Sequence, residues 1–164
     1  ISFQQSKRQS PSMRLGRRIA IDYGAARIGL AISSVDAILA SPLGTVTGGE
    51  GAVDRVLAEL ADIEPLEIYV GLPLNLAGEF TKSTDDALAL ARALAARVPV
   101  EIRMLDERMT TRAAQSQLFS SGRNSKSSRS LIDAAAASLI LEGALDFEKA
   151  TGNQPGRPLA EFDA

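Results

Sequence analysis

The chain alternates short apolar runs with segments of helical periodicity, and the order of these runs limits its fold more than any other feature. The first two runs, residues 17–24 and 27–33, are joined by a tight connection of Gly and Ala, so we expect an antiparallel hairpin. A third, shorter strand is expected over residues 42–47, where two glycines end the run.

From residue 52 onward, helical patterns and strands alternate. Between residues 52 and 63, apolar side chains recur every three or four positions, as on the buried face of a helix. Ser83 is the expected cap of a second helix. This second helix is expected over 83–97. Two more helices are expected from 110 or 111 to 122 and over 128–149, with strands over 67–72 and 100–106. The order β-β-β-α-β-α-β-α-α predicts an α/β protein with a mixed five-stranded sheet flanked by helices.

The length of 164 residues suits one domain with its own core. We expect a basic, flexible N-terminal extension over residues 1–16, a folded domain over 17–150 and a flexible tail over 151–164. Residues 1–18 carry five of the 18 basic residues and no acid, which leaves 13 basic and 20 acidic residues in the rest. The basic head is either a solubilising extension or an arm that grips phosphates, whereas the acidic body is a poor general binder of nucleic acid.

Cysteine, histidine and tryptophan are absent from the sequence. Their absence excludes disulfides, thiolate nucleophiles, zinc fingers and a Ser-His-Asp triad. An enzyme of this composition must use carboxylates, Lys, Tyr, hydroxyls, backbone groups or a hard metal ion held by oxygen. No apolar run reaches the roughly 18 residues of a membrane helix, and the lack of cysteine fits the cytoplasmic location that we expect.

Acidic residues stand at three informative positions. Asp22 ends the first strand, and Asp106 and Glu107 follow the strand over 100–106. The carboxyl ends of parallel strands meet at one edge of a sheet, where ligand sites collect. Asp133 lies early in an apolar helix, before four alanines that let the helix approach the sheet closely. Asp106 and Glu107 point to opposite faces of a regular strand, and alternation alone does not decide which one faces the site.

Carboxylates that converge at one edge repel each other unless a cation neutralises them. Mg²⁺ or Mn²⁺ does so with oxygen ligands alone, and such ions catalyse phosphoryl chemistry. Each acid also has a simpler interpretation. Asp22 suits a turn, and the other acids suit a helix N-terminus.

A second basic stretch, residues 123–129, contains Arg123, Lys126 and Arg129 and no acid. It lies between two predicted helices. It is therefore either a solvated connection or a mobile loop that contacts phosphates.

Four motifs in this order are similar to the YqgF/RuvX family over roughly residues 17–146. They are residues 22–29, 71–75, 106–111 and 132–136. That family comprises Holliday junction resolvases and nucleases that mature pre-16S ribosomal RNA, with a ribonuclease H-like fold. The resemblance implies that Asp22, Glu107 and Asp133 are catalytic, metal-binding acids, which favours Glu107 over Asp106. It also implies that the site is lined by Arg27, Asn75 and Arg108, with Thr110 beside them.

The expected function is therefore metal-dependent hydrolysis of phosphodiester bonds in structured nucleic acid, foremost the 5′-end maturation of pre-16S ribosomal RNA. Cleavage of Holliday junctions and a non-catalytic role in assembly or regulation are the alternatives. A phosphotransferase related to sugar kinases needs two such domains, which 164 residues cannot hold. With two Tyr and five Phe, extensive base stacking is not expected. The residues leave open whether the chain acts as a monomer or a homodimer.

Overall fold

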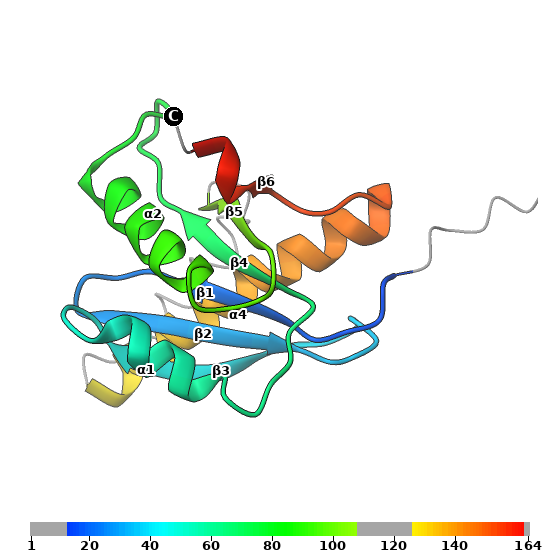
Figure 1. Ribbon diagram of the computed structural model, residues 1–164, viewed down its shortest axis with the longest axis horizontal. Coiled ribbons are helices and arrows are strands. Elements are labelled where there is room, and N and C mark those ends of the chain that lie inside the picture. The colour runs from blue at the N-terminus through cyan, green and yellow to red at the C-terminus, as the bar shows by residue number, and fades with distance from the viewer. Residues whose placement is uncertain (1–12, 108–125, 163–164) are drawn as a thin grey trace, which may run out of the picture.

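A mixed sheet with helices on both faces forms the body of the protein (Figure 1). The computed structural model describes residues 13–107 and 126–162, and over 126–131 it describes the backbone alone. The elements in chain order are β1 (Arg18–Asp22), β2 (Arg27–Ser33), β3 (Ala40–Thr47), α1 (Ala52–Glu59), β4 (Glu67–Leu72), α2 (Lys82–Ala95), β5 (Ile102–Asp106), α4 (Lys126–Thr151), β6 (Arg157–Pro158) and the 3₁₀ helix η2 (Leu159–Phe162). The helix predicted to end at 122 lies outside the described residues.

The strand order is β3-β2-β1-β4-β5-β6. The predicted hairpin is confirmed, since β1 pairs antiparallel with β2 and Asp22 stands opposite Gly29. Strands β1, β4 and β5 are parallel, so their last residues, Asp22, Leu72 and Asp106, lie at one edge of the sheet. We call it the carboxyl edge, and the opposite edge the amino edge. The α/β class and the mixed sheet are as predicted, but the count of five strands is wrong because β6 adds a sixth.

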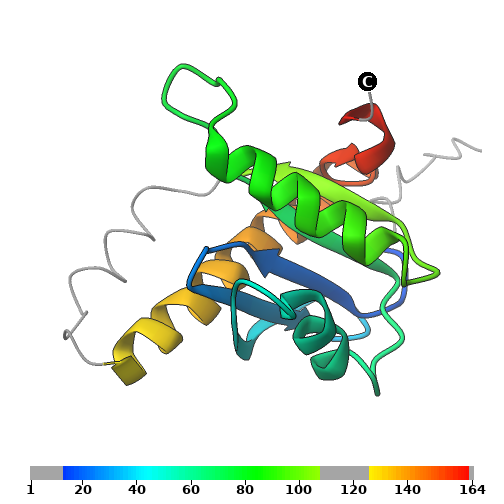
Figure 2. The ribbon, with the colours of Figure 1, turned by 60° about the vertical axis from the view of Figure 1, so that its left-hand side comes forward.

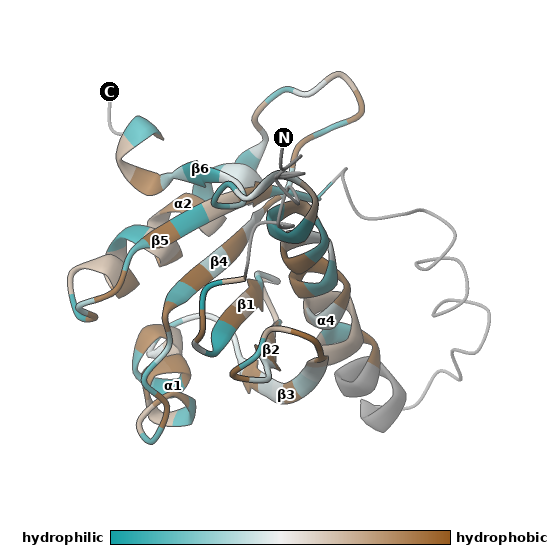
Figure 3. Cartoon of the chain, turned by 90° about the vertical axis from the view of Figure 1, so that its right-hand side faces the viewer, coloured by the Kyte–Doolittle hydropathy of each residue, from teal (hydrophilic) through white to brown (hydrophobic). Residues whose placement is uncertain are grey.

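The two faces of the sheet carry different helices. Figure 1 shows α1 and α2 in front of the sheet and α4 behind it, and Figure 3 shows the same two layers from the side. Ile19 and Ile21 of β1 belong to the core cluster under α1 and α2. Ala20 between them packs with Ala137 of α4, and these small side chains allow the helix to lie close to the sheet.

Helix α2 begins two residues earlier than predicted. Its cap is Thr81, not Ser83, and Thr81 and Thr84 form a reciprocal capping box. The Thr84 hydroxyl also donates to the Pro73 carbonyl, which fastens the loop after β4 to the helix. None of the described helices is long and apolar enough to cross a membrane.

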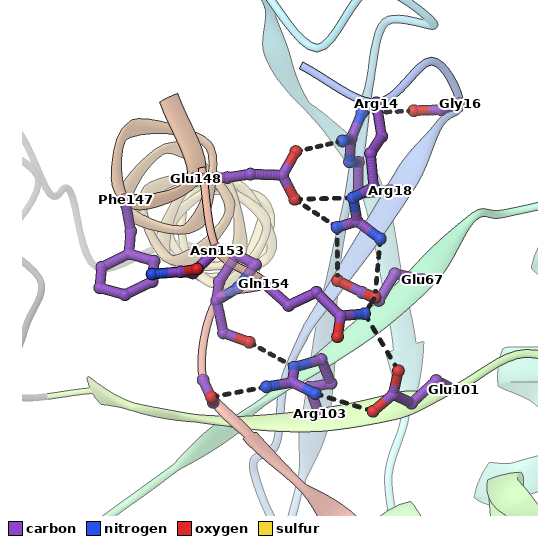
Figure 4. A network of polar contacts seen from close by, with 12 residues as sticks. Arg14, Gly16, Arg18, Glu67, Glu101, Arg103, Phe147, Glu148, Asn153 and Gln154 are labelled. Carbon is purple, nitrogen blue, oxygen red and sulfur yellow. Dashed lines mark hydrogen bonds and ion pairs between the residues drawn. The ribbon is translucent and has the colours of Figure 1, made fainter. Parts of the chain in front are cut away.

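The described ends of the chain make polar contacts with the rest of the domain. Arg14 pairs with Glu67 of β4 and Glu148 of α4 (Figure 4). Arg103 of β5 donates to the carbonyls of Pro155 and Gly156, at 2.6 and 2.9 Å, and thereby holds the segment that forms β6. Residues 13–16 and 151–162 thus have partners far away in the chain, which their polar sequence does not indicate.

Candidate active site

Asp22 is the last residue of β1 and lies on the sheet face that α4 covers. Its alternation partner Ala20 belongs to the cluster under α4. The neighbouring strands place a glycine on each side of it. Gly29 of β2 pairs with Asp22 directly, and Gly71 of β4 lies on the same face, two residues beyond the buried Tyr69.

Glu107 reaches Asp22 by crossing β4 over Gly71. The two carboxyl groups are joined by a hydrogen bond, although β4 separates their strands. A Cβ atom at Gly71 would lie 2.5 Å from Oε1 of Glu107 and 3.0 Å from its Cγ. The side chain of Glu107 therefore occupies the space that the glycine leaves. The structure selects Glu107 rather than Asp106 as the partner of Asp22.

Asp133 approaches from α4 through the second glycine. A Cβ atom at Gly29 would lie 2.1 Å from the main-chain oxygen of Asp133, so only glycine admits the helix backbone at this point. Figure 2 shows β1 (blue) ending beside the N-terminal half of α4 (yellow to orange). The Asp133 side chain, 29% exposed, accepts a hydrogen bond from Nε of Arg27 at 2.7 Å.

The electrostatics of the three acids are coupled. Burial raises the pKa of Asp22; the hydrogen bond with Glu107 opposes this rise and the charge of Asp133 adds to it. Burial and the charge of Asp22 raise the pKa of Glu107 to about 8. Glu107 therefore takes up a proton more readily than an isolated carboxyl group does, and the hydrogen bond with Asp22 favours this protonated form. A bound cation relieves the same repulsion.

The donor set suits a hard divalent ion, because it consists of carboxylate oxygens. Asp22 and Glu107 are already in contact. Among the residues that the structure describes, no three acidic side chains surround one point as metal ligands do. Asp133 is paired with Arg27, which binds one oxygen of its carboxylate.

The other predicted site residues fall into four groups. Arg27 contacts Asp133. Asn75 is exposed in the loop after β4, where its side-chain oxygen accepts from the backbone N–H groups of Ala77 and Glu79. Arg108, Thr110 and Arg123 lie outside the described residues, whereas Lys126 and Arg129 lie in the first turns of α4 rather than in the loop predicted for them.

Sequence reasoning missed the part played by the two glycines. Both stand inside strands, where glycine weakens the ladder, and neither adopts the left-handed conformation that would require it. A glycine inside a strand that does not need the left-handed conformation marks the close approach of another backbone or side chain. A glycine within a predicted strand is therefore the sequence signal that could have identified Gly29 and Gly71.

Comparisons with known proteins identify the family of the chain. Residues 16–147 match the family described as RuvX: Holliday junction resolvase. A relative from Leifsonia xyli named pre-16S rRNA nuclease is 48% identical over 149 residues, covering 90% of this chain and 96% of the relative. One of the same name from Streptomyces coelicolor is 44% identical over 156 residues, covering 93% of each.

Among solved structures, RuvC of Thermus thermophilus superposes with a TM-score of 0.56 at 19% identity, covering 87% of this chain and 99% of that chain. RuvC in complex with a Holliday junction substrate superposes equally well, at 17% identity. Identities this low show a shared fold. The match of the family model over most of the chain goes further, and the chain belongs to the RuvX family.

Proposed function

We propose that this chain is a divalent-metal-dependent nuclease that hydrolyses phosphodiester bonds in structured nucleic acid. The observation that carries the proposal is the contact between Asp22 and Glu107 at the carboxyl edge, with Asp133 beside them. Three acids from distant points of the chain approach each other there through two strand glycines. Stability alone gives no reason to assemble half-buried carboxyl groups in this way, because their mutual repulsion is unfavourable.

The residues divide the work as follows. Asp22 and Glu107 would hold Mg²⁺ or Mn²⁺ in place of the proton that they share, and Asp133 would complete the oxygen ligands after leaving Arg27. Such an ion supplies Lewis-acid stabilisation of the charge that develops on phosphate oxygens. Arg27, released from Asp133, would donate charge-assisted hydrogen bonds to the substrate phosphate.

The substrate that we propose is precursor 16S ribosomal RNA, cut near its 5′ end in the cytoplasm. The names of the close relatives support this choice. The family description favours Holliday junctions as the second candidate. Because the body of the protein is acidic, binding of either substrate depends on local cations, and we assign this role to Arg27, Arg108, Arg123, Lys126 and Arg129. Asn75 and Thr110 would add neutral hydrogen bonds.

The test compares a ribosomal RNA with its leader and a four-way DNA junction as substrates, with Mg²⁺ or Mn²⁺. We expect cleavage of the RNA by the wild type and none by Asp22→Asn with an unchanged melting temperature. Asp62→Asn, at an exposed acid of the amino edge, is the matched control and should cleave normally. Full activity of Asp22→Asn would reject the site, and binding without any cut would favour a non-catalytic role.

The oligomeric state of the protein further distinguishes a junction resolvase from an RNA-trimming enzyme. A resolvase makes paired, symmetric cuts and is expected to be a two-fold dimer, whereas an RNA-trimming enzyme has no such need. Light scattering on the free protein and on its junction complex would show which arrangement occurs.

A further inference from the structure

A cavity of about 500 Å³ opens at the carboxyl edge, next to the candidate active site. Its walls come from β4 and its following loop, β5, the second half of α4 and the C-terminal segment. Apolar side chains dominate it, among them Leu72, Leu74, Met104 and Ala144. A large apolar hollow with few polar groups is the common form of a small-molecule subsite.

The cavity gathers the scarce aromatic residues of the chain. Of five Phe in the sequence, Phe80, Phe147 and Phe162 line it, and the other two lie outside the described residues. Phe80 is 53% and Phe147 37% exposed, so their rings are open to a ligand. The rings of Phe80 and Phe162 lie 6.2 Å apart between centroids.

Two charged residues complete the lining. Arg157 places its guanidinium 4.6 Å above the ring of Phe162 while its Nε binds Glu161, and Asp106 lines the cavity from the end of β5. Aromatic faces beside a guanidinium match the chemistry of an unpaired nucleobase. Such bases stack on Phe and Arg and form hydrogen bonds along their edges.

The cavity lies close to the acids. Asp106 precedes Glu107 in the chain, and Ile140 lines the cavity while its Cδ1 would lie 3.0 Å from a Cβ at Gly71, in the gap that Glu107 crosses. A nucleotide whose phosphate lies at Asp22 and Glu107 therefore has this cavity beside it.

We propose that this cavity binds one unpaired base of the strand whose phosphate lies at the acids. The inference rests on the proposed function and deepens it. The cavity selects substrates with an unstacked base next to the scissile bond, which a continuous duplex does not offer. The small number of aromatic residues limits recognition to a single base rather than an extended stack.

The experiment uses a short single-stranded RNA that contains 2-aminopurine, whose fluorescence is quenched on stacking, bound to full-length Asp22→Asn protein so that nothing is cut. Phe147→Ala removes a stacking ring. Gly143→Leu fills the cavity from α4, where an added Cβ meets no atom within 4 Å and leucine favours the helix. Ile38→Ala, at a 75% exposed residue of the β2–β3 connection, is the control.

We expect quenching with Asp22→Asn alone and with the Ile38→Ala control. Phe147→Ala and Gly143→Leu should lose the quenching and bind about tenfold more weakly. The melting temperature of Phe147→Ala should stay near that of Asp22→Asn, and that of Gly143→Leu should not fall below it. Undiminished quenching in both cavity variants would overturn the proposal. So would a dimer in light scattering that Phe147→Ala dissociates without any effect on quenching, because a second copy would then fill the cavity. If the wild type cuts neither substrate while quenching still depends on Phe147, that outcome would support the base-binding cavity and contradict the proposed nuclease activity.

Discussion

Gly71 sets how closely Glu107 approaches Asp22, so a single methyl group there tests the geometry of the site. In Gly71→Ala the new Cβ would lie 2.5 Å from Oε1 of Glu107, which forces this carboxyl group away from Asp22. Alanine fits the backbone at this position, because Gly71 lacks a positive φ. We expect Mn²⁺ affinity, measured by titration, to fall about 10–100-fold, and cleavage to fall with it.

Gly143→Ala is the matched control for this methyl group. Nothing lies within 4 Å of a Cβ at Gly143, and alanine stabilises a helix interior by about 1 kcal/mol relative to glycine. We expect its Mn²⁺ affinity to equal that of the wild type and its melting temperature to rise. Wild-type Mn²⁺ affinity in Gly71→Ala would show that the spacing between Asp22 and Glu107 has no part in metal binding.

The sequence indicates which acids to consider, because strand ends and an alanine-rich helix are local signals. It does not separate Asp106 from Glu107, since that choice depends on a gap in another strand. Gly71 belongs to β4, which lies between Asp22 and Glu107 in the sheet. The strand order and register decide which side chain faces the space above Gly71, and a local sequence pattern predicts neither.

Helix α4 connects the two edges of the sheet. A substitution near its C-terminal end tests how strongly the helix is anchored to the sheet. Its early turns deliver Asp133 to the acids, and near its end Glu148 accepts from the fully buried Arg18 at 2.6 Å. Glu148→Gln would leave this guanidinium without its anion. Breaking a buried ion pair in this way costs about 3–5 kcal/mol, or roughly 10 °C in melting temperature.

Denaturation by heat and by urea measures this loss. Glu142→Gln removes a carboxylate from an exposed position of the same helix, and we expect it to change stability by less than about 0.5 kcal/mol. If Glu148→Gln is as stable as this control, the ion pair does not anchor α4.

The shortest elements are those that sequence reasoning missed. The long helices and the apolar strands follow from periodicity, since each carries its pattern within itself. Strand β6 has two residues, and its place depends on Arg103 of β5, whose guanidinium binds the carbonyls of Pro155 and Gly156. A polar segment held by one distant arginine has no periodicity to detect.

The whole molecule is joined at the amino edge through Glu67, which connects the N-terminal segment, the sheet and the C-terminal segment. Its carboxylate accepts from Arg14 at 3.0 and 3.2 Å, from the Tyr69 hydroxyl at 2.9 Å and from Gln154 at 2.6 Å. Both described ends of the chain thus contact one buried negative charge. Because protonation of Glu67 removes this charge, the pH dependence of unfolding reports on these contacts.

Burial alone would raise the pKa of Glu67, but the hydrogen bonds from Arg14 and Tyr69 hold it below its ordinary value of 4.5. A lowered pKa in the folded state stabilises the protein above the ordinary value, and this stability is lost as the pH falls through the lowered one. Wild type should therefore exceed Glu67→Gln in urea stability at pH 7, and the difference should shrink below pH 4.5. Glu64→Gln, at an exposed residue, controls for the loss of one carboxylate. A difference that stays constant down to pH 3 would mean that the charge of Glu67 does not hold the two ends to the sheet.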